Sequence, residues 1–424
     1  LHESVLRLVS SKPLCLFLLP FWLVKGIAFL KSKVVENSVL DITSLPYNLP
    51  LIDWLREQRA GGNKIVLCTA ANERIALAVA EHLDIFDEVI ASDASANLKS
   101  IKKRKALEKR FGDKGYAYAG NSSADIEVWA GASHAIVVNA AESVQTEASQ
   151  VASVSRTFPP VRIGFSVWFR ASRVHQWLKN LLLFVPLLAA HELSNVQSLT
   201  AVLIAFLSFS LCASSVYITN DLLDLESDRQ HPSKRHRPFA SAKLSIPIGV
   251  ALVPLLAGLG IVLGVVVGTE FLIVLLVYLL LTVIYSLVLK SIVLVDCLTL
   301  ATLYTIRIIA GAAAVSLPVS FWLLAFSVFI FLSLALVKRY AELTVMLQAG
   351  ISAAHGRGYT VLDIPILQTF GVSAGYISAL VMALYLRSDD IVSLYVQPKV
   401  IWFVIPILLF WVSWVWLKAT RGEM

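Results

Sequence analysis

The feature that most constrains this chain is a series of eight apolar segments in its C-terminal part. They lie near residues 176–190, 199–219, 244–266, 270–289, 293–314, 320–337, 363–385 and 399–418. Segments of this kind cross a bilayer as α-helices, because only a helix or a closed barrel satisfies every backbone group within lipid. Composition supports the same class, since 57% of the 424 residues are hydrophobic and only 15% are charged. The sequence therefore predicts a polytopic all-α membrane protein.

The connections between these segments alternate in charge. Basic residues gather around Arg229–Lys243, Lys290 and Lys338–Arg339, all on one side of the alternation. The positive-inside rule places that side in the cytoplasm. Topology and phosphate binding explain the net charge of +7, so we predict no nucleic-acid partner. The four cysteines show no paired spacing, and we expect neither a zinc site nor a disulfide framework.

A cluster of acidic residues follows the second apolar segment. It consists of Asp221, Asp224 and Asp228, and the amide residue Asn220 directly precedes it. On a helix the three aspartates share one face, because they are spaced i, i+3 and i+7. Carboxylates at a membrane boundary are costly and usually functional, and their hard oxygens suit Mg²⁺ bound together with substrate phosphates. The next basic residues are Arg229, Lys234, Arg235 and Arg237. We predict a diphosphate site here; the alternative is a helix end with solvated charges.

Residues 1–158 show a different pattern, and we predict a domain boundary between them and residues 159–424. Short apolar strands are predicted at 64–69, 86–91, 116–120 and 135–139, with helices at 73–83, 101–111 and 124–130. Strands that alternate with helices indicate an α/β domain with a parallel sheet. Residues 141–160 are rich in Ala, Ser and Glu and end in two prolines, which favours a linker.

The segment Pro13–Leu30 is strongly apolar but is interrupted by Pro20 and Lys25. It is barely long enough to span a bilayer. We therefore favour a cap helix that dips into the membrane surface over a true span. The chain begins with Leu1 rather than Met, and we expect its natural N-terminus to lie further upstream.

The pattern Asn-Asp-x-x-Asp-x-x-x-Asp after the second apolar segment resembles the first signature of the UbiA prenyltransferase superfamily. The resemblance covers about residues 170–424. It implies nine helices around a central cavity, of which eight are visible here, so we expect the ninth beyond Met424. It also implies an active site that binds Mg²⁺ through Asp221, Asp224 and Asp228, with Asn220 orienting a ligand.

Further motifs are similar to those of the decaprenyl-phosphate phosphoribosyltransferases of actinobacterial cell-wall synthesis. They contain Arg173, Gln176 and Lys179 at the first segment, Tyr285 and Lys290 after the fourth, Asp296 and Arg307 in the fifth, and Lys338 and Arg339 after the sixth. This resemblance implies transfer of 5-phosphoribose from phosphoribosyl diphosphate to a polyprenyl phosphate, in a bacterial plasma membrane. The residues at the first segment would hold the lipid phosphate, and Tyr285, Lys290 and Asp296 would hold the sugar phosphate or ribose. Arg307, Lys338 and Arg339 would be further substrate-binding residues.

Two other functions remain open. One is a UbiA-type enzyme that moves a prenyl group from a prenyl diphosphate to an aromatic or other acceptor. The aromatic prenyltransferases of the superfamily usually carry a second aspartate pair near the fifth segment, where this chain has Asp296 alone. The other is a transporter or lipid-binding protein with a degenerate site. The sequence also leaves the oligomeric state open.

The N-terminal part resembles phosphatases of the haloacid-dehalogenase type, which have a Rossmann-like α/β fold. Thr69 ends a strand where that fold places a phosphate-binding hydroxyl, Lys99 matches its lysine, and Asn121 and Asp125 match its last acidic motif. Asn121 stands where the family commonly has Asp. No Asp-x-Asp pair precedes Thr69, so we expect the first strand with the nucleophile to be missing and the domain to be inactive as it stands. A complete domain would remove the 5-phosphate from the lipid product.

Overall fold

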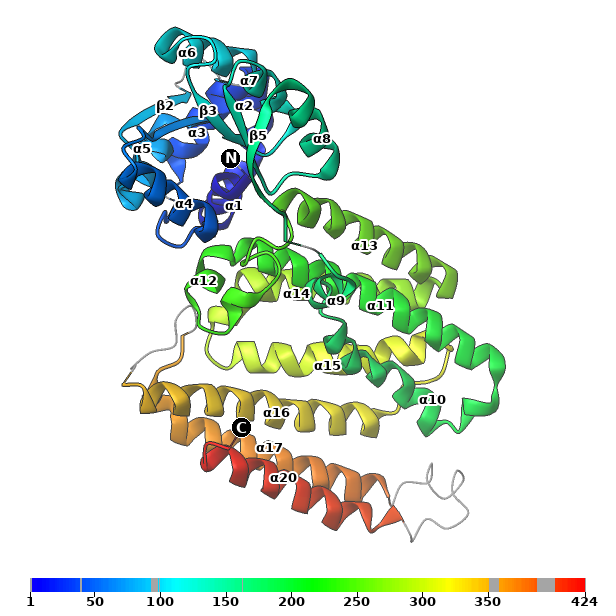
Figure 1. Cartoon of the computed structure of the whole chain (residues 1–424). Helices are drawn as coiled ribbons and strands as arrows, with labels where there is room; N and C mark the ends of the chain where they lie inside the picture. Colours follow the sequence, from blue (N-terminus) through cyan, green and yellow to red (C-terminus); the bar gives the residue numbers. More distant parts are fainter. Residues whose placement is uncertain are drawn as a thin grey trace. The chain divides into compact units, whose positions relative to one another are not determined.

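A computed structural model describes residues 2–38, 40–92, 98, 100–161, 163–350, 358–386 and 401–423 (Figure 1). The chain forms two compact units. The N-terminal unit contains Leu1–Ala171 and Thr219–Ala251, and the membrane unit contains Ser172–Ile218 and Leu252–Met424. The segment that carries the aspartates thus groups with the N-terminal part of the chain.

The N-terminal unit contains five short parallel strands that alternate with helices. They are β1 (Val66–Asn72), β2 (Glu88–Ser92), β3 (Ala117–Gly120), β4 (His134–Val138) and β5 (Ser153–Phe158). The helices between them are α5 (Glu73–Leu83), α6 (Ile101–Phe111), α7 (Ile126–Ala130) and α8 (Glu142–Val151), and α4 (Leu49–Ala60) precedes β1. The predicted strands and helices are confirmed, but the described strands form two sheets, β1-β2 and β3-β4-β5, rather than one.

The prediction of a linker at residues 141–160 is wrong. This segment forms α8 and β5, and β5 pairs in parallel with β4. Phe158 at the end of β5 is buried beside Ile136 and Val138, and it packs against Trp54 of α4. Most side chains of β5 are partly or fully exposed, and the strand accordingly has few apolar residues. A pattern of apolar residues therefore does not predict it.

The apolar segment near the N-terminus does not form one continuous helix. A first helix α1 (His2–Ser11) leads into a 3₁₀ helix (Pro13–Leu18), followed by α2 (Leu19–Val24) and α3 (Ile27–Asn37). Gly26 separates the last two with φ = 108°, a conformation that favours glycine. This geometry excludes a straight span across the segment.

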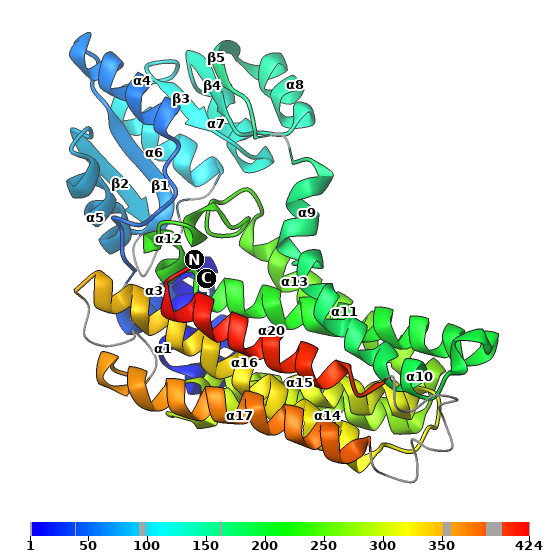
Figure 2. The ribbon, with the colours of Figure 1, turned by 90° about the horizontal axis from the view of Figure 1, so that it is seen from below.

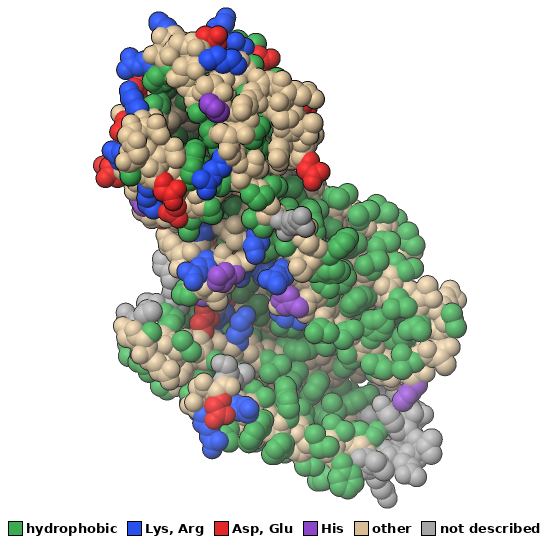
Figure 3. Space-filling model, in the orientation of Figure 1, with side chains coloured by type: hydrophobic (Ala, Val, Ile, Leu, Met, Phe, Trp, Pro, Cys, Tyr) green, Lys and Arg blue, Asp and Glu red, His purple; other side chains and the backbone are tan. Residues whose placement is uncertain are grey.

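Helices occupy all eight predicted apolar segments. Six are long and apolar enough to cross a membrane, namely α11 (Val196–Leu223), α13 (Ile246–Val267), α14 (Thr269–Leu287), α15 (Val295–Ala314), α16 (Phe321–Gln348) and the helix at Val361–Tyr385, which contains α17 (Ile364–Tyr385). Shorter apolar helices lie at Val174–Ala189, where a 3₁₀ helix (Val174–Phe184) leads into α10 (Val185–Ala189), and at α20 (Val404–Thr420). The protein is an integral membrane protein, and apolar side chains cover much of the face of its helical part that Figure 3 shows.

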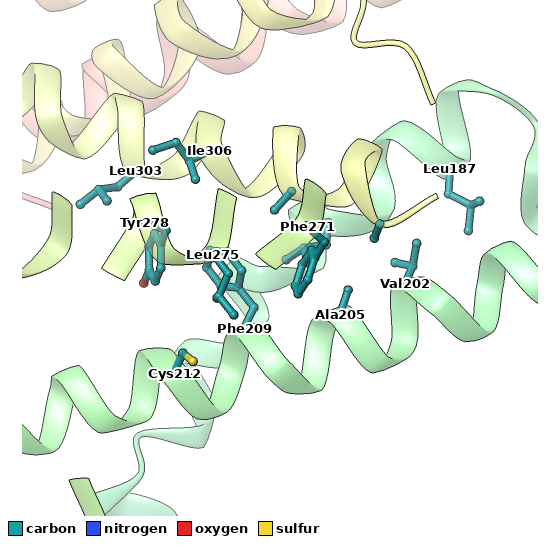
Figure 4. Packing of buried hydrophobic residues seen from close by; sticks show 13 residues of the cluster. Leu187, Val202, Ala205, Phe209, Cys212, Phe271, Leu275, Tyr278, Leu303 and Ile306 are labelled. Carbon is teal, nitrogen blue, oxygen red and sulfur yellow. The ribbon is translucent and has the colours of Figure 1, made fainter. Parts of the chain in front are cut away.

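The helices α16, α17 and α20 lie side by side in two perpendicular views (Figures 1 and 2). A second packed region joins the first apolar helix to α11, α14 and α15. Phe209, Leu275 and Tyr278 are among the buried side chains at its centre (Figure 4). Gly311 of α15 approaches the first helix so closely that a Cβ there would lie 2.0 Å from the carbonyl oxygen of Leu183. These helices therefore pack backbone against backbone at that point.

Candidate active site

The aspartate segment starts on the last turn of α11, which extends four residues past the predicted span. α12 (Leu225–Gln230) begins directly after Asp224. Helical hydrogen bonding continues through the junction, because Asp224 N donates to Asn220 O at 2.9 Å and Asp228 N donates to Asp224 O at 2.8 Å. Asp221 and Asp228 therefore fall on the same side, as the sequence predicts, but the prediction that Asp224 shares this buried face is wrong, because Asp224 is exposed at the junction of the two helices.

Two of the three aspartates meet at one arginine. Arg237 Nη1 lies 3.1 Å from Asp221 Oδ1 and 2.6 Å from Asp228 Oδ2. Both aspartates are only 2% exposed, whereas Asp224 is exposed to solvent. Arg237 therefore supplies a positive charge where two buried carboxylates converge.

The surroundings of Asp228 oppose its charged form. Burial raises the pKa of the Asp228 carboxyl above its usual range, and the hydrogen bond and positive charge of Arg237 offset only part of that effect. Asp228 therefore needs a cation to stay ionised as the pH falls. This is the electrostatic setting in which a divalent ion binds favourably.

The side chains at this point provide some of the ligands that a divalent cation requires. In the described segments of the chain, no three His, Cys, Asp or Glu side chains gather as a ready metal site. The Asp221 and Asp228 carboxylates still offer hard oxygens at one place, and Mg²⁺ commonly completes its shell with water and substrate phosphate oxygens. These two residues are the ones that would hold the ion.

The other predicted groups of this segment lie apart from the aspartate pair. Arg229 forms a bidentate ion pair with Glu3, with Nη2 at 2.7 Å from Oε1 and Nη1 at 3.1 Å from Oε2. Arg235 is exposed and Lys234 is half-buried. Asn220 contributes its backbone carbonyl to the helix junction. Of the four predicted basic residues, Arg237 is the one that forms ion pairs with both Asp221 and Asp228.

The membrane unit contains a buried cation with no acidic partner. Arg307 on α15 is 5% exposed; its Nε donates to Asn180 Oδ1 at 2.9 Å, and its Nη2 donates to Tyr278 OH at 3.2 Å. A further hydrogen bond goes to the carbonyl of Leu303. Among the described residues, no carboxylate forms an ion pair with Arg307 or with Lys179.

Aromatic rings line the same place. The guanidinium of Arg307 lies 5.0 Å from the ring of Tyr278, 5.3 Å from that of Tyr304 and 5.5 Å from that of Phe209. Lys179 Nζ lies 5.9 Å from the ring of Tyr304. Two cations that lie near one ring, without a carboxylate partner among the described residues, favour the binding of an anion, because uncompensated charge in a membrane is costly.

A second polar cluster in the membrane unit brings a buried arginine and a buried aspartate together, although Asp296 Oδ2 and Arg339 Nε have no hydrogen-bond partner among the described residues. Arg339 of α16 is 1% exposed and lies 2.8 Å from Asp296 of α15, which is 0% exposed. Arg339 also pairs with Glu342, and Tyr359 OH donates to Asp296 Oδ1 at 2.5 Å. Asp296 and Arg339, predicted as separate ligands, are therefore partners of each other.

The remaining predicted residues of the membrane unit differ in their exposure. The Arg173 guanidinium lies 5.2 Å from the ring of Tyr217. Gln176, Tyr285 and Lys290 are partly buried, and Lys338 is exposed. Sequence reasoning did not select Asn180, Tyr278 or Tyr359 as site residues. The predicted Arg307 and Asp296 could have indicated them, because a buried charge requires hydrogen-bonding partners on neighbouring helices.

In the N-terminal unit, Asp125 is the best-connected residue of the predicted phosphate-binding set. It is 7% exposed, and its Oδ2 accepts hydrogen bonds from Asn121 N and Ser122 N, each at 3.1 Å. Lys103 Nζ lies 3.6 Å from Asp125 Oδ1 and donates to Tyr118 OH at 2.6 Å. Burial and the Asp125 charge raise the pKa of Tyr118, so its neutral phenol donates to Asp125.

Two other predictions concern this set. Thr69 lies within β1, and its Oγ1 accepts a hydrogen bond from Ala71 N. Lys99 lies outside the described residues. Lys103, which is buried in the first turn of α6, is the lysine that the structure brings to Asp125.

Comparison with known proteins gives related proteins from bacteria. An uncharacterized protein y4nM of Sinorhizobium fredii is 34% identical over this whole chain, which spans 82% of that protein. The nodulation protein NoeC of Azorhizobium caulinodans is 39% identical over 62% of this chain and 85% of its own length. The decaprenyl-phosphate phosphoribosyltransferase of Mycobacterium tuberculosis is 36% identical over 46% of this chain and 65% of its own length.

A solved structure with a similar arrangement is that of a UbiA homologue from Archaeoglobus fulgidus bound to GPP and Mg²⁺. It is 16% identical and covers 60% of this chain and 88% of its own, with a TM-score of 0.48. The sequence model of the UbiA prenyltransferase family matches residues 181–422, which is more than half of the chain. This chain therefore belongs to the UbiA prenyltransferase family and is a membrane-embedded transferase.

Proposed function

We propose that this transferase moves 5-phosphoribose from phosphoribosyl diphosphate to a polyprenyl phosphate, with Mg²⁺ as its cofactor. The observation that carries the proposal is the pair of cations Arg307 and Lys179 in the membrane unit, for which the described part of the chain provides no acidic partner. An anionic lipid head group would compensate these charges. The similarity to decaprenyl-phosphate phosphoribosyltransferases supports this acceptor.

In the proposed reaction, a phosphate oxygen of the lipid attacks C1 of the ribose, and the bond between C1 and the diphosphate oxygen breaks. The diphosphate leaves with the bonding electron pair. A phosphate acceptor is already anionic at neutral pH, so the attack requires no general base. Mg²⁺ supplies charge neutralisation for the leaving diphosphate.

The residues of the chain have separate roles in this proposal. Asp221 and Asp228 hold the cation, and Arg237 stabilises their charges when the cation is absent. Lys179 and Arg307 bind the phosphate of the lipid. The paired cluster around Asp296 and Arg339 keeps α15 and α16 in register. Positive-inside alternation supports a cytoplasmic face for the aspartate segment, where soluble phosphosugars are available.

The test is an analysis of lipid products with two sets of substrates. The full chain in lipid nanodiscs receives Mg²⁺ with either phosphoribosyl diphosphate and polyprenyl phosphate, or a prenyl diphosphate and an aromatic acceptor. A phosphoribosylated lipid is expected from the first set. Turnover with the prenyl diphosphate alone would reject the proposal in favour of a prenyl donor.

Two variants sharpen this test. Asp221→Asn should abolish product formation, because it removes one of the two buried carboxylates. Asp53→Asn is the control, since Asp53 is an exposed partner of Arg56 on α4 and is remote in sequence from the aspartate segment. Equal activity of both variants would show that the aspartate pair does not take part in the transfer.

We further propose that the N-terminal unit is a haloacid-dehalogenase-like domain that binds phosphate. Its support is the cluster of Asp125, Lys103 and Tyr118, together with the alternation of parallel strands and helices. The sequence carries no Asp-x-Asp nucleophile before Thr69, so we expect this chain to release no phosphate from the lipid product. Phosphate release that Asp125→Ala abolishes would contradict this expectation.

A further inference from the structure

The N-terminal unit carries an exposed apolar segment between α1 and α3. Phe17, Phe21 and Val24 are 72%, 70% and 88% exposed, and Leu18, Leu23 and Ile27 are exposed as well. Six large apolar side chains within eleven residues exceed the scattered exposure that a water-facing surface normally shows. This segment, Phe17–Ile27, therefore requires a partner or an apolar phase that covers it.

The charges around this segment indicate which kind of apolar phase covers it. Five basic residues and no acidic residue lie between Glu3 and Glu36, namely Arg7, Lys12, Lys25, Lys31 and Lys33. Lys12 precedes the exposed segment and Lys25 lies near its end, and among the described residues neither forms an ion pair. Exposed aromatic and aliphatic side chains flanked by lysines are the pattern of a segment that lies in the interface of an anionic bilayer.

Contacts within the N-terminal unit join α1 to α12, which follows the membrane helix α11 in the chain. Glu3 and Arg7 of α1 form ion pairs with Arg229 and Glu226 of α12, at 2.7 Å and 3.0 Å. Arg229 follows the end of the membrane helix α11 by six residues, or about 9 Å of helix. The chain leaves α1 directly into the exposed segment, so the segment starts within reach of the bilayer surface.

We propose that Phe17–Ile27 inserts its apolar side chains into the interface of an anionic phospholipid bilayer and anchors the N-terminal unit there. Lys12 and Lys25 contact the phospholipid head groups. The break at Gly26 turns the chain so that α3 returns to the unit, where Val34 is fully buried and Lys31 donates to the carbonyl of Ala70. This anchor is independent of which group the transferase moves.

The test uses the full chain in nanodiscs with an environment-sensitive fluorescent amino acid in place of Phe21. Leu77 on α5, which is 50% exposed in the same unit, is the matched control position. In discs that contain phosphatidylglycerol, brominated acyl chains should quench the probe at position 21 and aqueous iodide should not. The probe at position 77 should show the reverse.

Charge reversal tests the contact of the lysines with the head groups separately from the insertion of the apolar side chains. Lys12→Glu with Lys25→Glu should reduce the bromine quenching at position 21 in anionic discs. Iodide quenching at position 21 equal to that at position 77 would overturn the proposal. A probe shielded from both quenchers would also overturn it, because that result shows a protein surface or a second copy of the chain as the occupant.

Discussion

Arg237 and Arg307 carry the same charge in opposite surroundings. Arg237 lies between two carboxylates, whereas Arg307 has only neutral oxygen partners and aromatic rings. A cation between acids stabilises the unliganded protein and competes with a metal ion for the same oxygens. A cation without acids stays available for an anionic substrate. Substitutions of Arg237 and Arg307 are therefore expected to have different effects.

Replacement of Arg237 by Gln should make the stability of the protein dependent on Mg²⁺. Without the guanidinium, two buried carboxylates repel each other, and unfolding should become easier by about 2 kcal/mol, less than for a fully buried pair because 28% of the Arg237 side chain is exposed. Added Mg²⁺ should raise the Tm of this variant more than that of the unmodified chain. Arg235→Gln, at an exposed position, is the control, and an equal Mg²⁺ response in both variants would contradict the prediction.

Two methionine substitutions should separate substrate binding from folding. Arg307→Met removes a buried charge that has no acidic partner, so its Tm should change little, whereas product formation should fall about 100-fold. Arg339→Met leaves Asp296 unpaired within the membrane unit and should cost about 3 to 5 kcal/mol of stability. Thermal unfolding in detergent and product analysis provide both readouts. A collapse of Tm in Arg307→Met would instead assign Arg307 a structural role.

At the scale of elements, local patterns predicted the helices well and the last strand poorly. Long apolar segments at 199–219, 270–289 and 293–314 formed helices because lipid leaves no other partner for their backbone groups. Most residues of β5 are polar, and its position depends on pairing with β4 rather than on its own composition. β5 therefore depends on residues of β4, which lie outside the stretch of sequence that forms β5.

Close packing of α15 against the first apolar helix gives a prediction for two glycines. Gly311→Ala places a Cβ against the backbone of Leu183 and should lower stability by about 2 kcal/mol, because backbone cannot move aside as a side chain can. Gly258→Ala on α13 meets no atom within 4 Å and should leave stability unchanged or raise it by about 0.5 to 1 kcal/mol. Denaturant titration of both variants checks this. Equal effects would show that the helices do not touch at Gly311.

At the scale of the whole molecule, the charge alternation predicts which face of the membrane each connection occupies. With Cys15 and Cys68 changed to Ser, single cysteines replace exposed Ser194, before α11, or exposed Ser233, after α12. A membrane-impermeant maleimide should label position 194 in intact cells and position 233 only after permeabilisation. The opposite result would place the aspartate segment outside the cell and remove the supply of soluble phosphosugars from the proposed reaction.

The sequence alone determined that this protein lies in a membrane, where its helices are and which segment gathers acids, because length, hydropathy and helical spacing are local properties. Only the tertiary structure decided which charges meet. Arg307 and Asn180 are 127 residues apart, and Arg339 lies 43 positions after Asp296, yet each pair is in contact. Arg237 forms ion pairs with two aspartates that lie 16 and 9 positions before it in the chain. These pairings depend on helix packing and loop conformation, which no local pattern specifies.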